Sequence, residues 1–305
     1  MDVRDFAHRM PHDGGFVEVA DRCWVARYEY LDVNVGIVGG ERGLLVVDTH
    51  ASETAARMVV EQVRRLGAGE VVAVVNTHQH FDHCFGNVVF SEAYDGLAIH
   101  AHEAAVTGLA ESGPALQAEA TRDEQPDAQR SKEVAQTRIV LPDHTFSSAR
   151  AVDLGDRFVE LIHPGRGHTA GDAVVRVPDV DVLFAGDLVE ESARGTSTTG
   201  GMPGFGDDCY PLEWPFTLDL MASMLSGGSV VVPGHGLPVD KDFVLEQRGS
   251  IGVVAETIRE LAGSGVMLSD ALTRTEWPYP VEELRHAVAR GYAQLPPGGR
   301  ALPLA

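Results

Sequence analysis

The chain has 305 residues, of which 44% are hydrophobic and 23% are charged, a composition typical of a globular protein with a substantial core. Its 45 acidic residues outnumber its 24 basic ones, so the formal net charge at pH 7 is −21. This charge repels phosphate backbones and anionic membrane surfaces, so we expect neither nucleic acid nor a membrane as a partner. Residues 1–15 lack the apolar segment of a secretory signal, and three widely spaced cysteines form no disulfide framework. We therefore expect a cytoplasmic protein.

The first part of the chain predicts short strands followed by a helix and a buried strand. Residues 16–47 are rich in Val, Ile, Tyr and Trp and are interrupted by turn signals, which indicates several short strands. A helix should begin after Ser52 and close at Gly67, because the apolar residues between them recur at helical spacing. Residues 71–75 form a continuous apolar run, which is typical of a strand buried on both faces.

The rest of the chain predicts further strands and helices in alternation. Strands are expected at 97–100, 138–141, 151–154, 158–162, 173–177, 182–185 and 230–232, and helices at 102–109, 243–262 and 281–295. Residues 118–137 are highly charged and fit either a solvated helix or a mobile excursion of the chain. The order predicts two sheets flanked by helices in one domain over residues 1–295, followed by a loose tail over 296–305.

The segment THQHFDH directly follows the apolar run at 71–75. His78 and His80 are two residues apart, so in an extended segment their side chains point the same way and can grip one ion. Asp82 and His83 come where the chain turns, and they can face a second position beside the first. This density of ligand-type residues after a buried strand predicts a metal site. Imidazole and carboxylate ligands without thiolate favour zinc, iron or manganese.

Three later segments repeat one pattern, in which an apolar run is followed by glycine and then by a ligand-type residue. They contain His168 in GRGHTAGD, Asp187 in LFAGD and His235 in VVVPGHG. Core packing alone does not explain this repetition. We therefore expect these three side chains to complete the metal site from distant parts of the chain.

Together with Asp48 in VVDTH, these motifs resemble the metallo-beta-lactamase-fold superfamily across nearly the whole chain. The resemblance implies an α/β fold in the form of a four-layer αβ/βα sandwich, with a metal centre at one edge between the sheets. It also implies the ligands of two metals, zinc ions or alternatively iron or manganese: His78, His80 and His168 for the first, Asp82, His83 and His235 for the second, and Asp187 as the bridge.

The resemblance further implies supporting residues and a reaction. Asp48 would hydrogen-bond to a ligand loop, while Thr169 and Asp172 would do likewise or would simply cap a turn. A hydroxide bridging the two metals would attack the carbonyl of a small-molecule ester, thioester, lactone or amide. Asp82 would act in catalysis by orienting the hydroxide and accepting its proton. The substrate can be anionic, because the metals would make the centre locally positive.

Other members of the family remain alternatives. Beta-lactamases of this fold carry Cys or Ser where Asp187 stands, which argues against a dedicated beta-lactamase. Persulfide dioxygenases hold one iron with the ligand types of His78, His168 and Asp187, so an oxidoreductase stays open. A non-catalytic metal-binding protein is the third alternative.

Substrate contacts lie outside the metal ligands. Phe81, Tyr210 and Trp214 are candidates for a substrate pocket, although each can equally be a packing aromatic. The glycine-rich segment 195–208 is a candidate lid over the site. Cys84 is expected to be a small buried residue rather than a nucleophile. An oligomer is possible.

Overall fold

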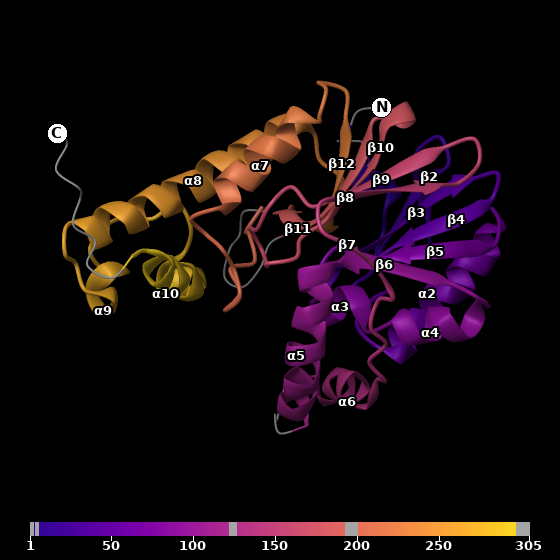
Figure 1. Ribbon diagram of the computed structural model, residues 1–305, viewed down its shortest axis with the longest axis horizontal. Helices are drawn as coiled ribbons and strands as arrows, with labels where there is room; N and C mark the ends of the chain where they lie inside the picture. Colours follow the sequence, from indigo (N-terminus) through magenta and orange to yellow (C-terminus); the bar gives the residue numbers. More distant parts are fainter. Residues whose placement is uncertain (1–2, 4–5, 122–126, 193–200, 297–305) are drawn as a thin grey trace.

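The computed structural model describes residues 3, 6–121, 127–192 and 201–296. The predictions for the tail beyond 296 and for residues 195–200 of the candidate lid fall outside these residues. Two sheets face each other (Figure 1). The seven-stranded sheet has the order β1 (Val17–Ala20), β2 (Cys23–Arg27), β3 (Asn34–Gly40), β4 (Gly43–Val47), β5 (Val71–Val75), β6 (Ala98–His102) and β7 (His144–Phe146). The five-stranded sheet has the order β12 (Val230–His235), β11 (Val182–Glu190), β10 (Val174–Val177), β9 (Phe158–Ile162) and β8 (Ala149–Asp153).

Helices cover the outer faces of both sheets, except that Phe6 of the short first helix packs into the core between them. The helices before the second sheet in the chain are α1 (Phe6–Arg9), α2 (Glu53–Leu66), α3 (Phe81–Cys84), α4 (Asn87–Ala93), α5 (Glu103–Ala120) and α6 (Ala128–Gln136). Those after β11 are α7 (Trp214–Ser223), α8 (Lys241–Gly263), α9 (Leu268–Ala271) and α10 (Arg285–Gln294). Short 3-10 turns lie at η2 (Tyr30–Asp32), η3 (Pro178–Val180) and η4 (Val281–Leu284).

Apolar cores separate the layers of this sandwich. Leu45 of β4 and Phe184 of β11 belong to the core between the sheets, whereas Val46 points the other way and packs with Val59 of α2. This alternation follows from the pleat of a strand, which turns successive side chains to opposite faces. A third core joins β11 and β12 to α7, α8 and α10. The helix–sheet–sheet–helix order confirms the predicted sandwich.

Local signals for α2 are also confirmed. Ser52 Oγ accepts a hydrogen bond from the Ala55 amide at 3.2 Å, so the side chain caps the first turn. Gly67 ends the helix with a φ of 64°, a left-handed conformation that glycine adopts without a side-chain clash.

The strand predicted at 138–141 is wrong. The Arg138 amide donates to Glu53 Oε1 at 3.2 Å, and the Val140 carbonyl accepts from Asn87 Nδ2 at 3.1 Å. The polar groups of this segment are thus paired with the helical layer, and the edge strand β7 forms only at His144–Phe146.

Of the two alternatives for the charged segment 118–137, the structure shows a helix, α6, over part of it. Two other helical segments differ from the predictions. Helix α5 runs well beyond 109 and through Pro114, in a sequence rich in alanine, which favours helix. Helix α7 was not predicted. Over the residues that the structure describes, no helix is long and apolar enough to cross a bilayer.

The close approach of the two sheets makes Gly36 a test of the fold. A Cβ at Gly36 would lie 2.3 Å from a ring carbon of Phe184 in the opposite sheet. We expect Gly36→Ala to lower the free energy of unfolding by about 1–3 kcal/mol, because the ring must move within a packed core. Chemical denaturation measures this change.

The matched control is Gly249→Ala on α8, where a Cβ meets no atom within 4 Å. Alanine is the better helix former by about 0.5–1 kcal/mol, so this variant should be at least as stable as the parent. Equal stability of the Gly36→Ala variant and the parent would contradict the proposed contact between the sheets.

Candidate metal centre

The candidate metal centre lies where the ends of strands from both sheets meet. Strand β5 delivers the segment from Thr77 to His83 from the first sheet, and the turn after β9 delivers His168 from the second. Asp187 lies in β11, and His235 is the last residue of the parallel neighbour β12. Strands β11 and β12 are buried along their whole length, β5 is buried except at Val72, and β9 buries alternate residues. These strands fix the positions of the loop residues.

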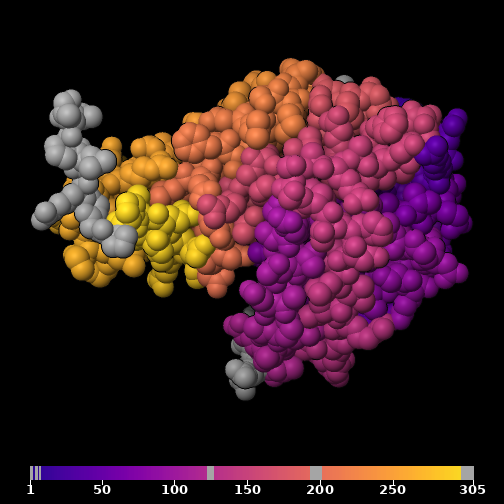
Figure 2. Space-filling model, in the orientation of Figure 1, coloured from indigo at the N-terminus to yellow at the C-terminus, as the bar shows by residue number. Residues whose placement is uncertain are grey.

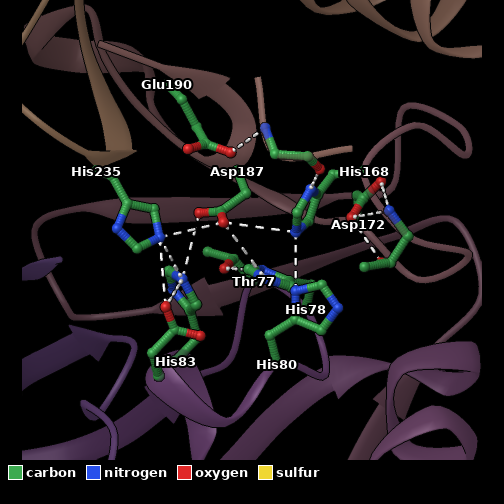
Figure 3. A network of polar contacts seen from close by, with 12 residues as sticks. Thr77, His78, His80, His83, His168, Asp172, Asp187, Glu190 and His235 are labelled. Atoms are coloured by element: carbon green, nitrogen blue, oxygen red, sulfur yellow. Dashed lines mark hydrogen bonds and ion pairs between the residues drawn. The ribbon is translucent and has the colours of Figure 1, made fainter. Parts of the chain in front are cut away.

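The structure brings together all seven residues that were named as metal ligands. Their ligand atoms form two groups, each with all members within 4.8 Å of one another: His78, His80, His168 and Asp187, and then Asp82, His83 and His235. Figure 3 shows the imidazoles converging on the Asp187 carboxylate.

Asp187 reaches both groups. Its Oδ2 lies 3.5 Å from His168 Nε2 and 3.2 Å from His235 Nε2. Its Oδ1 lies 3.2 Å from His83 Nε2. One buried carboxylate therefore stands between the two groups, as a bridging ligand would. Asp82 lies on the far side of the second group, with its Oδ2 3.4 Å from His235 Nε2.

Each of the five histidines also uses its outer ring nitrogen. These nitrogens lie within hydrogen-bond distance of a fixed oxygen: His78 Nδ1 at 3.1 Å from Thr77 Oγ1, His80 Nε2 at 3.2 Å from Asp208 Oδ2, His83 Nδ1 at 2.8 Å from Asp48 Oδ2, His168 Nδ1 at 2.8 Å from the Gly204 carbonyl, and His235 Nδ1 at 2.7 Å from the Leu31 carbonyl. Such outer partners orient a metal-binding imidazole and select its tautomer. The inner nitrogens are left facing the centre.

The electrostatics of the buried residues fit a bound cation. His78 Nε2 is buried and has no hydrogen-bond partner among the described residues, which is unfavourable unless something else binds it. Burial, reinforced by the neighbouring His83, lowers the pKa of His78 well below its usual value, so the imidazole is in the neutral form that binds metals.

His83 shows the opposite effect and points to the same conclusion. Burial acts to lower its pKa, but Asp187, Asp82 and Asp48 outweigh burial and raise the pKa well above the usual value. The three carboxylates thus require a positive charge beside them. A divalent cation would supply that charge and leave His83 neutral, so the residues present fit a metal.

Asp48 supports the ligand loop in the way the resemblance implied. Its carboxylate accepts hydrogen bonds from the Thr77 amide at 2.8 Å and from Thr77 Oγ1 at 2.9 Å, besides facing His83. Its main chain has a φ of 64°, an unusual value for a residue other than glycine. The surrounding hydrogen bonds hold this conformation, which places the carboxylate beneath the centre.

Asp172 and Thr169 brace the turn that carries His168. The Thr169 amide and hydroxyl both donate to the Asp172 carboxylate, the hydroxyl at 2.6 Å. Burial raises the pKa of Asp172 to about 7 in spite of these hydrogen bonds. These hydrogen bonds join the Thr169 backbone and side chain to the Asp172 carboxylate, so the two residues support His168 through the turn that carries it.

Two acidic residues of the site were missed by the sequence analysis. Asp208 faces His80, and Glu190 is fully buried near Asp187 and His235, where its Oε1 accepts from the Gly204 amide at 2.7 Å. Glu190 ends β11, so a longer strand prediction would have drawn attention to a carboxylate in a buried run. Asp208 follows a glycine-rich segment and has no motif that marks it.

A cavity of about 780 Å³ opens beside the centre, and three candidate ligands line it, namely His80, Asp82 and Asp187. Its other walls include residues of α5 and Arg290 of α10, and Figure 2 shows the surface hollowed between these two helices. The volume is typical of a small-molecule site.

The three predicted pocket aromatics fall into two groups. Phe81 and Tyr210 line the cavity. Trp214 does not, because it is fully buried, donates its Nε1 to the Leu188 carbonyl at 3.2 Å and packs against His168 and Phe205. Cys84 is also buried, and burial raises the pKa of its thiol well above the usual value, so it is no thiolate nucleophile.

Comparisons with known proteins agree with this fold and site. The family model described as "Metallo-beta-lactamase superfamily" matches residues 28–235, and the chain belongs to this superfamily. A metallo-beta-lactamase type 2 from Bacillus sp. (strain 170) is 26% identical over 209 residues, which cover 68% of this chain and 68% of that protein. A linear primary-alkylsulfatase from Pseudomonas sp. (strain ATCC 19151) is 23% identical over 223 residues, covering 67% of this chain and 41% of that protein.

One solved structure resembles nearly the whole chain. A stereoselective inverting sec-alkylsulfatase from Pseudomonas sp. superposes with a TM-score of 0.70 at 16% identity, over 92% of this chain and 50% of that one. The chain therefore spans about half the length of that protein, and the likeness shows a shared fold. Family, relatives and site together define the protein as a metal-dependent hydrolase.

Asp208 offers a test of the outer partners. We expect Asp208→Ala to weaken metal binding by roughly 10–100-fold, because His80 loses the carboxylate that orients it. Competition with a chromophoric chelator measures the affinity. Asp207→Ala is the matched control, since Asp207 is exposed and its carboxylate does not face His80. Equal affinities in the two variants would contradict this role of Asp208.

The packing of Gly234 against Asp187 offers a second test. A Cβ at Gly234 would lie 1.9 Å from Asp187 Oδ1, so Gly234→Ala must displace the carboxylate. We expect metal affinity to fall at least about tenfold, since Asp187 belongs to the first group and lies within 3.2 Å of His83 and His235 of the second. In the control Gly227→Ala, a Cβ meets no atom within 4 Å and metal affinity should be unchanged. Retained affinity in the Gly234→Ala variant would contradict the central role of Asp187.

Proposed function

We propose that the protein is a dinuclear-zinc hydrolase that cleaves a small-molecule ester, thioester, lactone or amide. The observation that carries the proposal is the position of Asp187, whose two oxygens lie 3.2 Å from His83 and from His235 while the carboxylate also belongs to the first group. A single metal in the first group would not account for the second group of Asp82, His83 and His235.

Asp82 and Asp48 would have different roles in the proposed hydrolysis. When bound, two divalent metals supply a hydroxide nucleophile at neutral pH and polarise the substrate carbonyl. Asp82 lines the cavity and stands beside the second group, so it can accept the proton of the attacking water and hold it for the leaving group. Asp48 keeps His83 and the ligand loop in register with the strand.

The setting proposed for this activity follows from charge and cysteine chemistry. The proposed substrate is a small molecule, which can be anionic. The protein can also form an oligomer. Cys23, Cys84 and Cys209 are free and buried, which suits a reducing compartment, and we place the protein in the cytoplasm. We treat residues 1–295 as one domain.

Metal analysis of the purified protein, combined with a substrate panel, tests the proposal. We expect two zinc ions per chain and hydrolysis of at least one member of a panel of lactones, glutathione thioesters, beta-lactams and aryl esters. One iron per chain with oxygen uptake on a persulfide would instead support the dioxygenase alternative. Bound metal without any turnover would support a metal-binding protein that is not a catalyst.

Substitutions of two proposed ligands test the site itself. His80→Ala and Asp187→Ala should each lower both kcat/KM and the metal content. The loss in kcat/KM should exceed roughly 100-fold, because loss of an outer hydrogen-bond partner alone lowers it by roughly 10–100-fold. The control is His144→Ala, because this histidine lies on the edge strand β7 and takes no part in either group. Full activity and metal content in His80→Ala or Asp187→Ala would refute the assignment.

A further inference from the structure

A second cavity adjoins the one beside the metal centre. It has a volume of about 370 Å³ and shares four lining residues with the first cavity, namely Leu31, Phe81, Leu116 and Glu119. The two cavities therefore adjoin along these four residues, with His80 and Asp82 lining the first cavity and residues of α6 lining the second. We call the second cavity the side trench.

The entrance to the side trench is largely apolar. Leu31, Phe81 and Leu116 come from three separate elements, η2, α3 and α5, and meet at the junction of the two cavities. Ala120 and Val134 continue the apolar wall inside the trench. An apolar wall beside a polar reaction centre favours a ligand with a reacting head and an aliphatic tail.

Leu31 is held at this junction at a conformational cost. Its side chain is 41% exposed and its φ is 66°, in the left-handed region that disfavours residues with a side chain. The turn is fixed on both sides, because the Leu31 carbonyl lies 2.7 Å from His235 Nδ1 and the Asp32 carboxylate forms a fork with Arg27. A strained backbone that displays an exposed leucine beside a reaction centre indicates a binding role.

The far end of the side trench does not favour an anion. Arg130 lies over the ring of Tyr30 at 4.9 Å, and its guanidinium is within ion-pair distance of both Asp127 and Glu133. The positive charge is thus balanced by two carboxylates, and Glu119 adds another at the entrance. A neutral tail fits these surroundings better than a charged one.

We propose that the side trench binds the aliphatic chain of the substrate, so that the enzyme prefers esters or thioesters of medium-length acyl groups. This specificity rests on the proposed hydrolase function. The reaction is plain hydrolysis: water adds to the carbonyl carbon, the bond to the leaving oxygen or sulfur breaks, and the leaving group takes up a proton. Only the acyl chain occupies the trench, and it contacts Leu31, Phe81 and Leu116.

Binding of n-alkyl hydroxamates to the zinc-loaded protein tests the trench without relying on turnover. We expect affinity to rise by about fourfold per methylene from acetohydroxamate to octanohydroxamate, which is what burial of a methylene provides. Isothermal titration calorimetry measures each affinity. In parallel, kcat/KM for p-nitrophenyl esters should rise over the same range of chain lengths.

Two substitutions at Leu116 localise the effect. Leu116→Trp fills the entrance and Leu116→Gln makes it polar at similar length, so both should lower the ratio of octanohydroxamate to acetohydroxamate affinity at least about tenfold. Leu245→Trp on α8 is the matched control, because Leu245 is 43% exposed and lies outside both cavities. The control should keep the ratio of the parent protein.

The possible outcomes separate the trench from the proposed reaction. The proposed chain-binding role of the side trench would be overturned if the affinity of the parent for hydroxamates did not rise with chain length. It would also be overturned if both Leu116 variants kept the rise seen in the parent, even if esters are hydrolysed. A steep series that the Leu116 variants flatten, with no ester or thioester cleaved, would uphold the chain-binding site and refute the proposed hydrolysis.

Discussion

The buried carboxylate of Asp187 is the interaction on which the rest of this structure depends. It sits between two groups of imidazoles and carries a negative charge in a place without solvent, which is unfavourable unless cations surround it. Burial acts to raise its pKa, yet His235, His83, His78 and His168 outweigh burial and hold the pKa well below the usual value. A bound cation would replace the protons with which the histidines otherwise balance this carboxylate.

The sandwich makes this arrangement possible because its two sheets supply the ligands from opposite sides. Strand β5 belongs to the first sheet, and β11 and β12 belong to the second. The sheets come together over an apolar core, and at Gly36 and Phe184 they approach so closely that only glycine fits. The spacing of the ligand groups is thus set by core packing, and the hydrogen bonds to the outer ring nitrogens then fix the orientation of each imidazole.

The sequence is most informative where a feature is local. The cap of α2, the apolar run of β5 and the density of ligands in THQHFDH can each be predicted from neighbouring residues, and the structure agrees with all of them. That His168, Asp187 and His235 join the same site was indicated by the repeated pattern of apolar run, glycine and ligand-type residue, whereas the assignment of each residue to one metal came only from resemblance to a family.

Features that depend on tertiary contacts escaped prediction. Residues 138–141 have the composition of a strand, yet their backbone groups pair with Glu53 and Asn87 of the helical layer. Trp214 follows the glycine-rich segment as a pocket residue would, but the third core buries it. Asp208 acquires its role only because the loop returns to His80, and no local pattern reports such a return.

The turn at Leu31 links substrate selection to the metal centre. Its carbonyl orients His235, while its side chain lines both the reaction cavity and the side trench. A change in this backbone would therefore alter metal geometry and chain binding together. Leu116, on α5, faces the same entrance but has no bond to a candidate ligand. Chain-length preference can consequently vary through α5 without disturbing the metals, whereas the turn at Leu31 must satisfy both requirements at once.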